Sequence, residues 1–301
     1  MVKTTKPIKH DSSYYQDSQA YLYISPLVTH FKWTARQNGN NGGGGRRGKI
    51  TVFSAKSRRR LIRYLFSLEK SPVVMVTLTY PKEWNPDYEV WKRDLDVFLK
   101  RVARKFPKYW FIWKLEFQKR GAPHFHLLGS FGEGVVVNKE VMEWVSRAWY
   151  EVVNSGYEKH LKAGTNIEVL DSKKKVIFYV CKYISKEDMP KDENKKSIKV
   201  GRWWGKSGNV PNRCVVAVRF NVSEYVMVKR LVKRWVKANV REALKKGKRK
   251  LFGFYKWLKK FHRSNWYIYI DMITMVKLIK AVCNYPIEMM QIKPCEVKFV
   301  L

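Results

Sequence analysis

The 301-residue sequence has few acidic residues, few cysteines and no long uncharged apolar run. Only 25 Asp and Glu stand against 61 Lys and Arg, which leaves a formal net charge of +36. We expect a folded chain this positive to bind nucleic acid, because neutralising phosphates releases their counterions. An anionic membrane surface is the alternative that charge alone leaves open.

The four cysteines are widely spaced and form no Cys-x-x-Cys pair, which argues against a zinc ribbon and a disulfide scaffold and favours the cytoplasm. Residues 1–10 are polar and basic, so we expect no signal peptide. The most apolar stretch, 266–282, is interrupted by Asp271, Lys277 and Lys280. It predicts a packed amphipathic helix rather than a membrane span.

Hydrophobic residues make up 45% of the chain and aromatic residues 15%, enough for a folded core. A glycine- and asparagine-rich stretch at 38–45 predicts a flexible loop, and a very basic helical pattern begins near 222. We therefore expect an N-terminal extension over 1–49, a central domain over 50–221, and a basic, mainly helical C-terminal region over 222–301.

The central domain mixes strand and helix patterns. β-branched and apolar runs predict strands, and spacings of three and four predict amphipathic helices. The expected strands are 73–80, 109–117, 124–129, 166–170 and 214–221, and the expected helices are 54–68, 87–106, 139–153 and 175–186. Gly121 to Pro123 predict a turn that makes a hairpin of the second and third strands. This order favours an α+β fold with a central antiparallel sheet and flanking helices.

A His-x-His pair in the hairpin is the first candidate for chemistry. Residues two apart in a strand face the same way, so His124 and His126 share one side of the sheet. Glu116 and Gln118 lie on the partner strand, and either could complete a site. Two imidazoles and a carboxylate suit a divalent cation such as Mg²⁺ or Mn²⁺, with positions left open for phosphate oxygens and water.

The second candidate is a helix with tyrosines and lysines on one face. Tyr179, Lys182, Tyr183 and Lys186 coincide at about 100° per residue. Tyrosines at the rim of the core beside solvated lysines are the competing interpretation. A neutral phenol is a poor nucleophile, so attack on a phosphodiester requires a metal and nearby cations. The His-x-His pair, this helix and the basic charge together supply those parts.

Arginines close to these motifs are candidates for phosphate contact. Arg58, Arg59 and Arg60 cluster in the predicted helix 54–68, and Arg202 follows the tyrosine helix. Phosphate contacts commonly come from such side chains, although a solvated helix face would show the same pattern.

Four segments resemble the motifs of the HUH endonucleases, and among them the two-tyrosine rolling-circle replication initiators of plasmids and single-stranded DNA phages. The segments are 76–81, 121–128, 179–186 and 201–205. The resemblance implies an HUH-type nuclease core in the central domain. It also implies that His124 and His126 bind the metal, with Glu116 as the best match for a third ligand, and that Tyr179 and Tyr183 are the nucleophiles.

From this resemblance we expect metal-dependent nicking and joining of single-stranded or hairpin origin DNA through a 5′-phosphotyrosine, with Lys182 stabilising charge. Residues 201–207 are one residue short of a P-loop, so unwinding would require a host helicase, and extension a host DNA polymerase.

Three other functions compete. A two-tyrosine transposase of the same chemistry shares nearly all these features. A non-catalytic basic nucleic-acid-binding protein would use the histidines and tyrosines structurally. An iron oxygenase with two histidines and a carboxylate would leave the +36 charge and the tyrosine helix unexplained.

Overall fold

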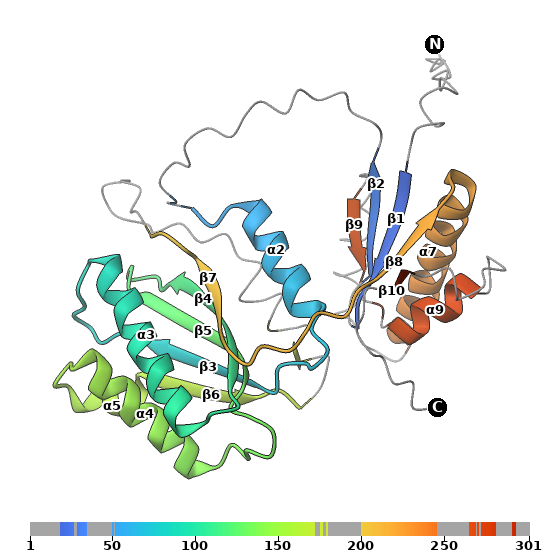
Figure 1. Cartoon of the computed structure of the whole chain (residues 1–301). Helices are drawn as coiled ribbons and strands as arrows, with labels where there is room; N and C mark the ends of the chain where they lie inside the picture. The colour runs from blue at the N-terminus through green and yellow to red at the C-terminus, as the bar shows by residue number, and fades with distance from the viewer. Residues whose placement is uncertain are drawn as a thin grey trace. The chain divides into compact units, whose positions relative to one another are not determined.

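The computed structural model describes residues 19–26, 29–34, 50, 52–171, 175, 176, 179, 200–245, 265–268, 270, 272–280, 291 and 292. The chain divides into a central unit, 44–213, and a terminal unit that combines 1–43 with 214–301. Each unit contains a five-stranded antiparallel sheet (Figure 1). The expected α+β class is therefore confirmed.

The central unit has the strand order β6-β3-β5-β4-β7. Its strands are β3 (Val74–Thr79), β4 (Trp110–Phe117), β5 (Pro123–Ser130), β6 (Thr165–Val169) and β7 (Trp204–Gly208). The predicted hairpin is β4–β5, and Gly121 turns it with a φ of +82°. The hairpin thus lies at the centre of the sheet, with β3 against one side of it and β7 against the other.

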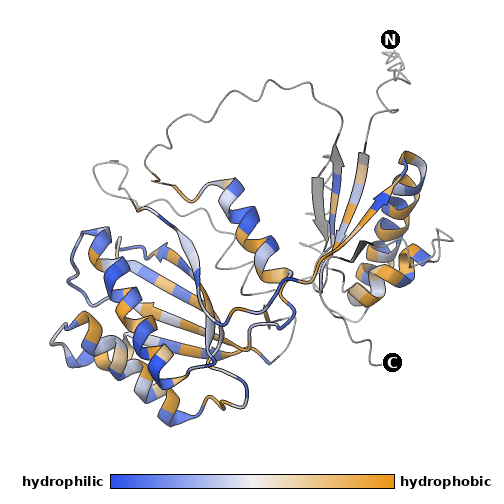
Figure 2. Cartoon of the chain, in the orientation of Figure 1, coloured by the Kyte–Doolittle hydropathy of each residue, from blue (hydrophilic) through white to orange (hydrophobic). Residues whose placement is uncertain are grey.

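Helices α3 (Tyr88–Lys105) and α4 (Lys139–Val153) cover one face of this sheet, and the short α5 (Glu158–Ala163) follows α4 (Figure 1). Their apolar stripes face the strands, and polar residues alternate with them along each helix (Figure 2). Trp91 of α3 packs edge-on against Phe117, with 5.7 Å between ring centroids. Side-chain oxygens of Asp87 and Asn138 cap the two long helices, which explains where each begins.

Helix α2 (Ala55–Phe66) lies on the opposite face of the sheet. The indole nitrogen of Trp204, on β7, donates to Ser57 of this helix at 3.1 Å. Trp204 pairs in register with Lys114, so both point to the face that α3 and α4 leave uncovered.

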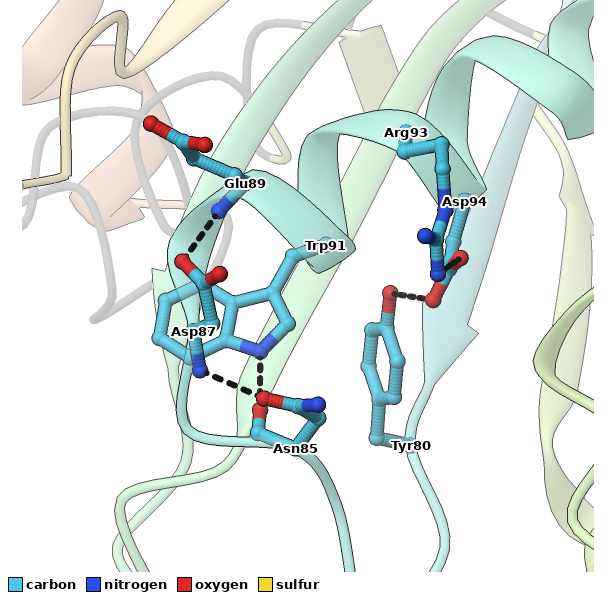
Figure 3. A network of polar contacts seen from close by, with 7 residues as sticks. All are labelled: Tyr80, Asn85, Asp87, Glu89, Trp91, Arg93 and Asp94. Atoms are coloured by element: carbon cyan, nitrogen blue, oxygen red, sulfur yellow. Dashed lines mark hydrogen bonds and ion pairs between the residues drawn. The ribbon is translucent and has the colours of Figure 1, made fainter.

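A buried polar contact joins the end of β3 to α3 (Figure 3). The Tyr80 hydroxyl donates to Asp94 Oδ2 at 3.0 Å, and Arg93 lies 3.6 Å from the other carboxylate oxygen. Burial raises the pKa of Asp94 and of Tyr80, because both charged forms lose water; the hydrogen bond from Tyr80 works the other way on Asp94. At the start of the same helix, the Trp91 indole donates to the Asn85 carbonyl at 2.5 Å.

The terminal unit has the strand order β10-β8-β1-β2-β9. The strands are β1 (Gln19–Ile24), β2 (Thr29–Thr34), β8 (Val216–Phe220), β9 (Asn265–Ile268) and β10 (Gln291–Ile292). Its helices are α7 (Val222–Lys245) and α9 (Met272–Lys280). The core of the unit contains side chains from both chain segments, including Leu22, Phe31, Val218, Val232 and Met275.

The structural boundaries differ from the expected domains. Residues 19–34 form two strands of a sheet rather than an extension. The last strand expected in the central domain, near 214–221, is β8 of the terminal unit. The region after 222, expected to be mainly helical, also supplies β9 and β10. Pairing between strands as distant in the chain as β1 and β8 leaves no local trace in the sequence, which explains the difference.

The expected helix 175–186 is described only at residues 175, 176 and 179, and all three are helical. Among the described residues, no helix combines the length and apolarity that crossing a bilayer requires.

Candidate metal and catalytic site

The central unit gathers polar side chains on the sheet face opposite α3 and α4. Strand register places His124 beside Thr79 and Glu116, and His126 beside Thr77 and Lys114. Paired residues of antiparallel strands share a face, so these six side chains form one cluster across β3, β5 and β4.

The predicted metal ligands are brought together in this cluster. His126 Nε2 lies 3.0 Å from Glu116 Oε2, and both side chains are buried. The rings of His124 and His126 lie 4.7 Å apart between centroids and are nearly perpendicular, at 82°. His124 is half-buried, so the cluster remains accessible at this end.

Two threonines orient the imidazoles. Thr79 Oγ1 lies 3.0 Å from His124 Nδ1, and Thr77 Oγ1 lies 3.3 Å from His126 Nδ1. When each Nδ1–H donates to its threonine, each Nε2 keeps a lone pair, which is the tautomer that coordinates a metal. The threonines therefore have the position and chemistry of residues that support metal ligands.

The geometry of the pair fits a hard divalent ion. Adjacent ligands in a regular octahedron with bonds of about 2.1 Å are about 3.0 Å apart, and His126 Nε2 and Glu116 Oε2 are separated by 3.0 Å. In the described part of the chain, no group of three or more His, Cys, Asp or Glu side chains is already arranged to hold an ion. A rotation of the half-buried His124 side chain would be needed to complete the set.

Gln118, the other candidate for the third ligand, is committed elsewhere. Its Oε1 accepts a hydrogen bond from Arg120 Nε at 2.9 Å. The same guanidinium donates to the carbonyl oxygens of Tyr80 and Pro81, at 2.5 and 2.6 Å. Arg120 thus ties the loop after β3 to the hairpin before His124, and Glu116 is the better placed ligand.

Thr79 is itself held from the helical side. Its carbonyl oxygen is 2.9 Å from both Trp149 Nε1 and His160 Nε2, and its N–H donates to the Gly164 carbonyl at 2.8 Å. Burial lowers the pKa of His160, which favours the neutral ring. The neutral ring donates from Nε2 to Thr79, while its Nδ1 lies 2.9 Å from the Ser155 hydroxyl.

Lys114 is a residue of this face that sequence reasoning missed. It is only 1% exposed, and its Nζ lies 5.3 Å from the centre of the Phe53 ring. Counting back two residues from Glu116 on the predicted strand would have placed it on the ligand face. It brings a positive charge into the neighbourhood of the histidines.

The other predicted site residues lie on helices and in the segment before β7. Tyr179 is half-buried and helical, whereas Lys182, Tyr183 and Lys186 lie outside the described residues. On α2, Arg59 and Arg60 are exposed and Arg58 is half-buried. Arg202 is half-buried, and its carbonyl accepts from Lys92 Nζ at 2.5 Å.

The segment that contains this cluster is similar to a known family. Residues 73–188 match the family model of replication-associated protein ORF2, or gene 2 protein. The matched segment runs from β3 to the tyrosine helix and contains His124, His126, Glu116, Tyr179 and Tyr183. No curated protein and no solved structure gives a significant match. The match confirms the resemblance to replication initiators for this part of the central unit.

Proposed function

We propose that this protein initiates rolling-circle replication by nicking one DNA strand at an origin and joining the cut end to a tyrosine. The convergence of His124, His126 and Glu116 on one sheet face, within the segment that matches a replication-associated family, carries the proposal. The net charge of +36 suits a polyanionic substrate.

His124, His126 and Glu116 would hold Mg²⁺ or Mn²⁺, which supplies Lewis-acid polarisation of the scissile phosphate. Thr79 and Thr77 keep the imidazole nitrogens directed at the site. Lys114 adds positive charge beside them, where negative charge develops on the phosphoryl oxygens during attack.

Tyr179 or Tyr183 is the nucleophile. Its oxygen bonds to phosphorus as the bond to the 3′ oxygen breaks; the phenol proton is lost and the leaving 3′ oxygen gains one. The products are a 5′-phosphotyrosine and a free 3′-OH that a host polymerase extends after a host helicase opens the duplex. The number of phosphoester bonds is unchanged, so the strand is resealed without ATP.

Two tyrosines one helical turn apart allow successive rounds of attack, and Lys182 between them stabilises a phenolate. Arg58, Arg59, Arg60, Lys186 and Arg202 contact the phosphates of single-stranded or hairpin origin DNA.

Covalent capture tests this proposal. Single-stranded fragments that tile the replicon encoding the protein are incubated with it and Mn²⁺, and adducts that survive SDS are counted. We expect an adduct with one fragment and none after EDTA treatment. Tyr179→Phe/Tyr183→Phe should abolish it, whereas Tyr157→Phe, an exposed tyrosine of the same unit, should leave it unchanged. An adduct that persists in the double variant would overturn the assignment of the nucleophile.

A further inference from the structure

A basic groove lies on the outer surface of the α3–α4 helix pair. It has a volume of about 430 Å³ and is lined by Arg101, Arg104 and Lys105 from α3, and by Trp144, Arg147 and Glu151 from α4. Because these helices cover the sheet face opposite the histidines, the groove belongs to a different surface from the candidate metal site.

Most of the positive charge in the groove is not neutralised by acidic side chains. Arg101 contacts Glu151 at 2.5 Å. Arg104, Lys105 and Arg147 form no ion pair with any described residue, and all three are exposed. Three uncompensated cations therefore line one recess.

Helix electrostatics explains only part of this cluster. Arg104 and Lys105 are in the last turn of α3, where cations favour the negative end of the helix dipole. Arg147 has no such reason, because it lies in the middle of α4, more than one turn before Val153. Its position across from the α3 cations brings like charges together, and this is favourable only if an anion binds between them.

We infer that this groove binds the phosphodiester backbone of duplex DNA flanking the nicked strand. This inference rests on the proposed function for its partner. Guanidinium groups recognise phosphate oxygens in pairs, and the spacing i, i+3, i+4 puts Arg101, Arg104 and Lys105 on one helix face. A free nucleotide fits less well, because the one aromatic side chain in the groove, Trp144, already packs edge-on against Phe106 at 5.3 Å.

The test compares two triple variants that remove the same charge. Arg104→Gln/Lys105→Gln/Arg147→Gln empties the groove of its unpaired cations. Lys70→Gln/Lys139→Gln/Lys159→Gln removes three exposed lysines of the same unit that do not line it. Binding of a fluorescent mixed-sequence duplex of about 30 base pairs is measured across a salt series in EDTA, so that no cleavage is involved.

Because the groove variant lacks three phosphate-binding cations, its slope of log affinity against log salt should be smaller than that of the wild type by about 2.7. Between about 50 and 200 mM salt, wild-type affinity should then drop about 40-fold more than that of the groove variant. The slope of the control variant should fall by less than half as much. Equal reductions in both variants, or an unchanged slope in the groove variant, would overturn the inference.

The outcome is independent of the nicking chemistry. A protein that forms no covalent adduct but shows the groove-specific change in slope would refute the proposed function and leave the binding surface standing. Thermal unfolding of both variants verifies that they are folded.

Discussion

His124 is oriented by a neighbour on the next strand rather than by a residue near it in sequence. Thr79 contacts its Nδ1 at 3.0 Å, and Thr79 is itself held by Trp149, His160 and Gly164. Supporting residues of this kind usually affect metal affinity by ten- to a hundredfold. At the residue scale, metal binding should therefore depend on a hydroxyl that no ligand motif contains.

Replacing Thr79 with valine should lower Mn²⁺ affinity about 10-fold, because the isosteric side chain cannot accept from His124 Nδ1. Thr79→Ser keeps the hydroxyl and is the matched control. Mn²⁺ binding to the whole protein is measured by electron paramagnetic resonance of the free ion. Equal affinities in the valine and serine variants would show that the threonine does not orient the ring.

Removing the Tyr80 hydroxyl should destabilise the central unit. Tyr80→Phe leaves the buried Asp94 Oδ2 without its donor, and an unsatisfied buried polar group costs about 1–3 kcal/mol. Tyr88→Phe removes a hydroxyl that donates to the exposed Glu89 and should change stability by less than about 0.5 kcal/mol. Urea unfolding of the two variants makes the comparison, and similar losses would contradict it.

At the scale of elements, α3 contains a lysine that is poorly hydrated. Lys92 Nζ lies 4.4 Å from the centre of the Trp113 ring and 5.4 Å from that of Phe125, and it donates to the Arg202 carbonyl. Burial, with a smaller contribution from the charge of Arg202, lowers the pKa of Lys92 to about 7. The helix thus packs on the sheet at the expense of an ammonium group.

This lowered pKa has a defined consequence for stability. Below pH 7 the amine is charged in both the folded and the unfolded chain, so the penalty is fully present. Between about 7 and 10.5 the unfolded chain binds a proton that the folded chain does not, and the penalty is relieved as pH rises.

The free energy of unfolding of the wild type should therefore rise relative to Lys92→Met as the pH increases from about 7 to 9. Loss of the bond to Arg202 shifts the two curves by a constant, so their slopes carry the test. Lys100→Met, at an exposed position of the same helix, should run parallel to the wild type. Parallel curves for Lys92→Met would show that its pKa is not lowered.

Sequence patterns predicted some elements of the site and missed others. Strands β3, β4 and β5 were predicted because buried apolar runs and a glycine turn mark them. Strand β7 was missed because Trp204–Gly208 has no apolar alternation. It becomes a strand by pairing with β4, and its Gly205 allows the close approach of Trp113, whose ring would lie 2.6 Å from an added Cβ.

At the scale of the whole molecule, the terminal unit is assembled from both ends of the chain. Strand β8 pairs with β1 on one side and β10 on the other, so its partners are outside the central unit. A domain boundary placed after this strand therefore separates it from both neighbours.

Two fragments test this division. Residues 44–213 should be monomeric and unfold cooperatively, because all five strands of the sheet are kept. Residues 50–221 should self-associate, because Val216, Val218 and Phe220 lose the partners that bury them and a strand edge is exposed. Light scattering after size-exclusion chromatography measures both; a monomeric 50–221 fragment would argue against the division.

The sequence by itself determined the net charge, the hairpin, and the placement of His124, His126 and Glu116 on one face, because these follow from composition, a turn and the two-residue period of a strand. Only the tertiary structure decided that Thr79 and Lys114 flank the histidines, that β7 exists, and that residues 19–34 share a sheet with 216–220. Those features depend on which strands pair and in what register. The energy that selects a register comes from side chains distant in the chain, so it cannot be read from any local segment.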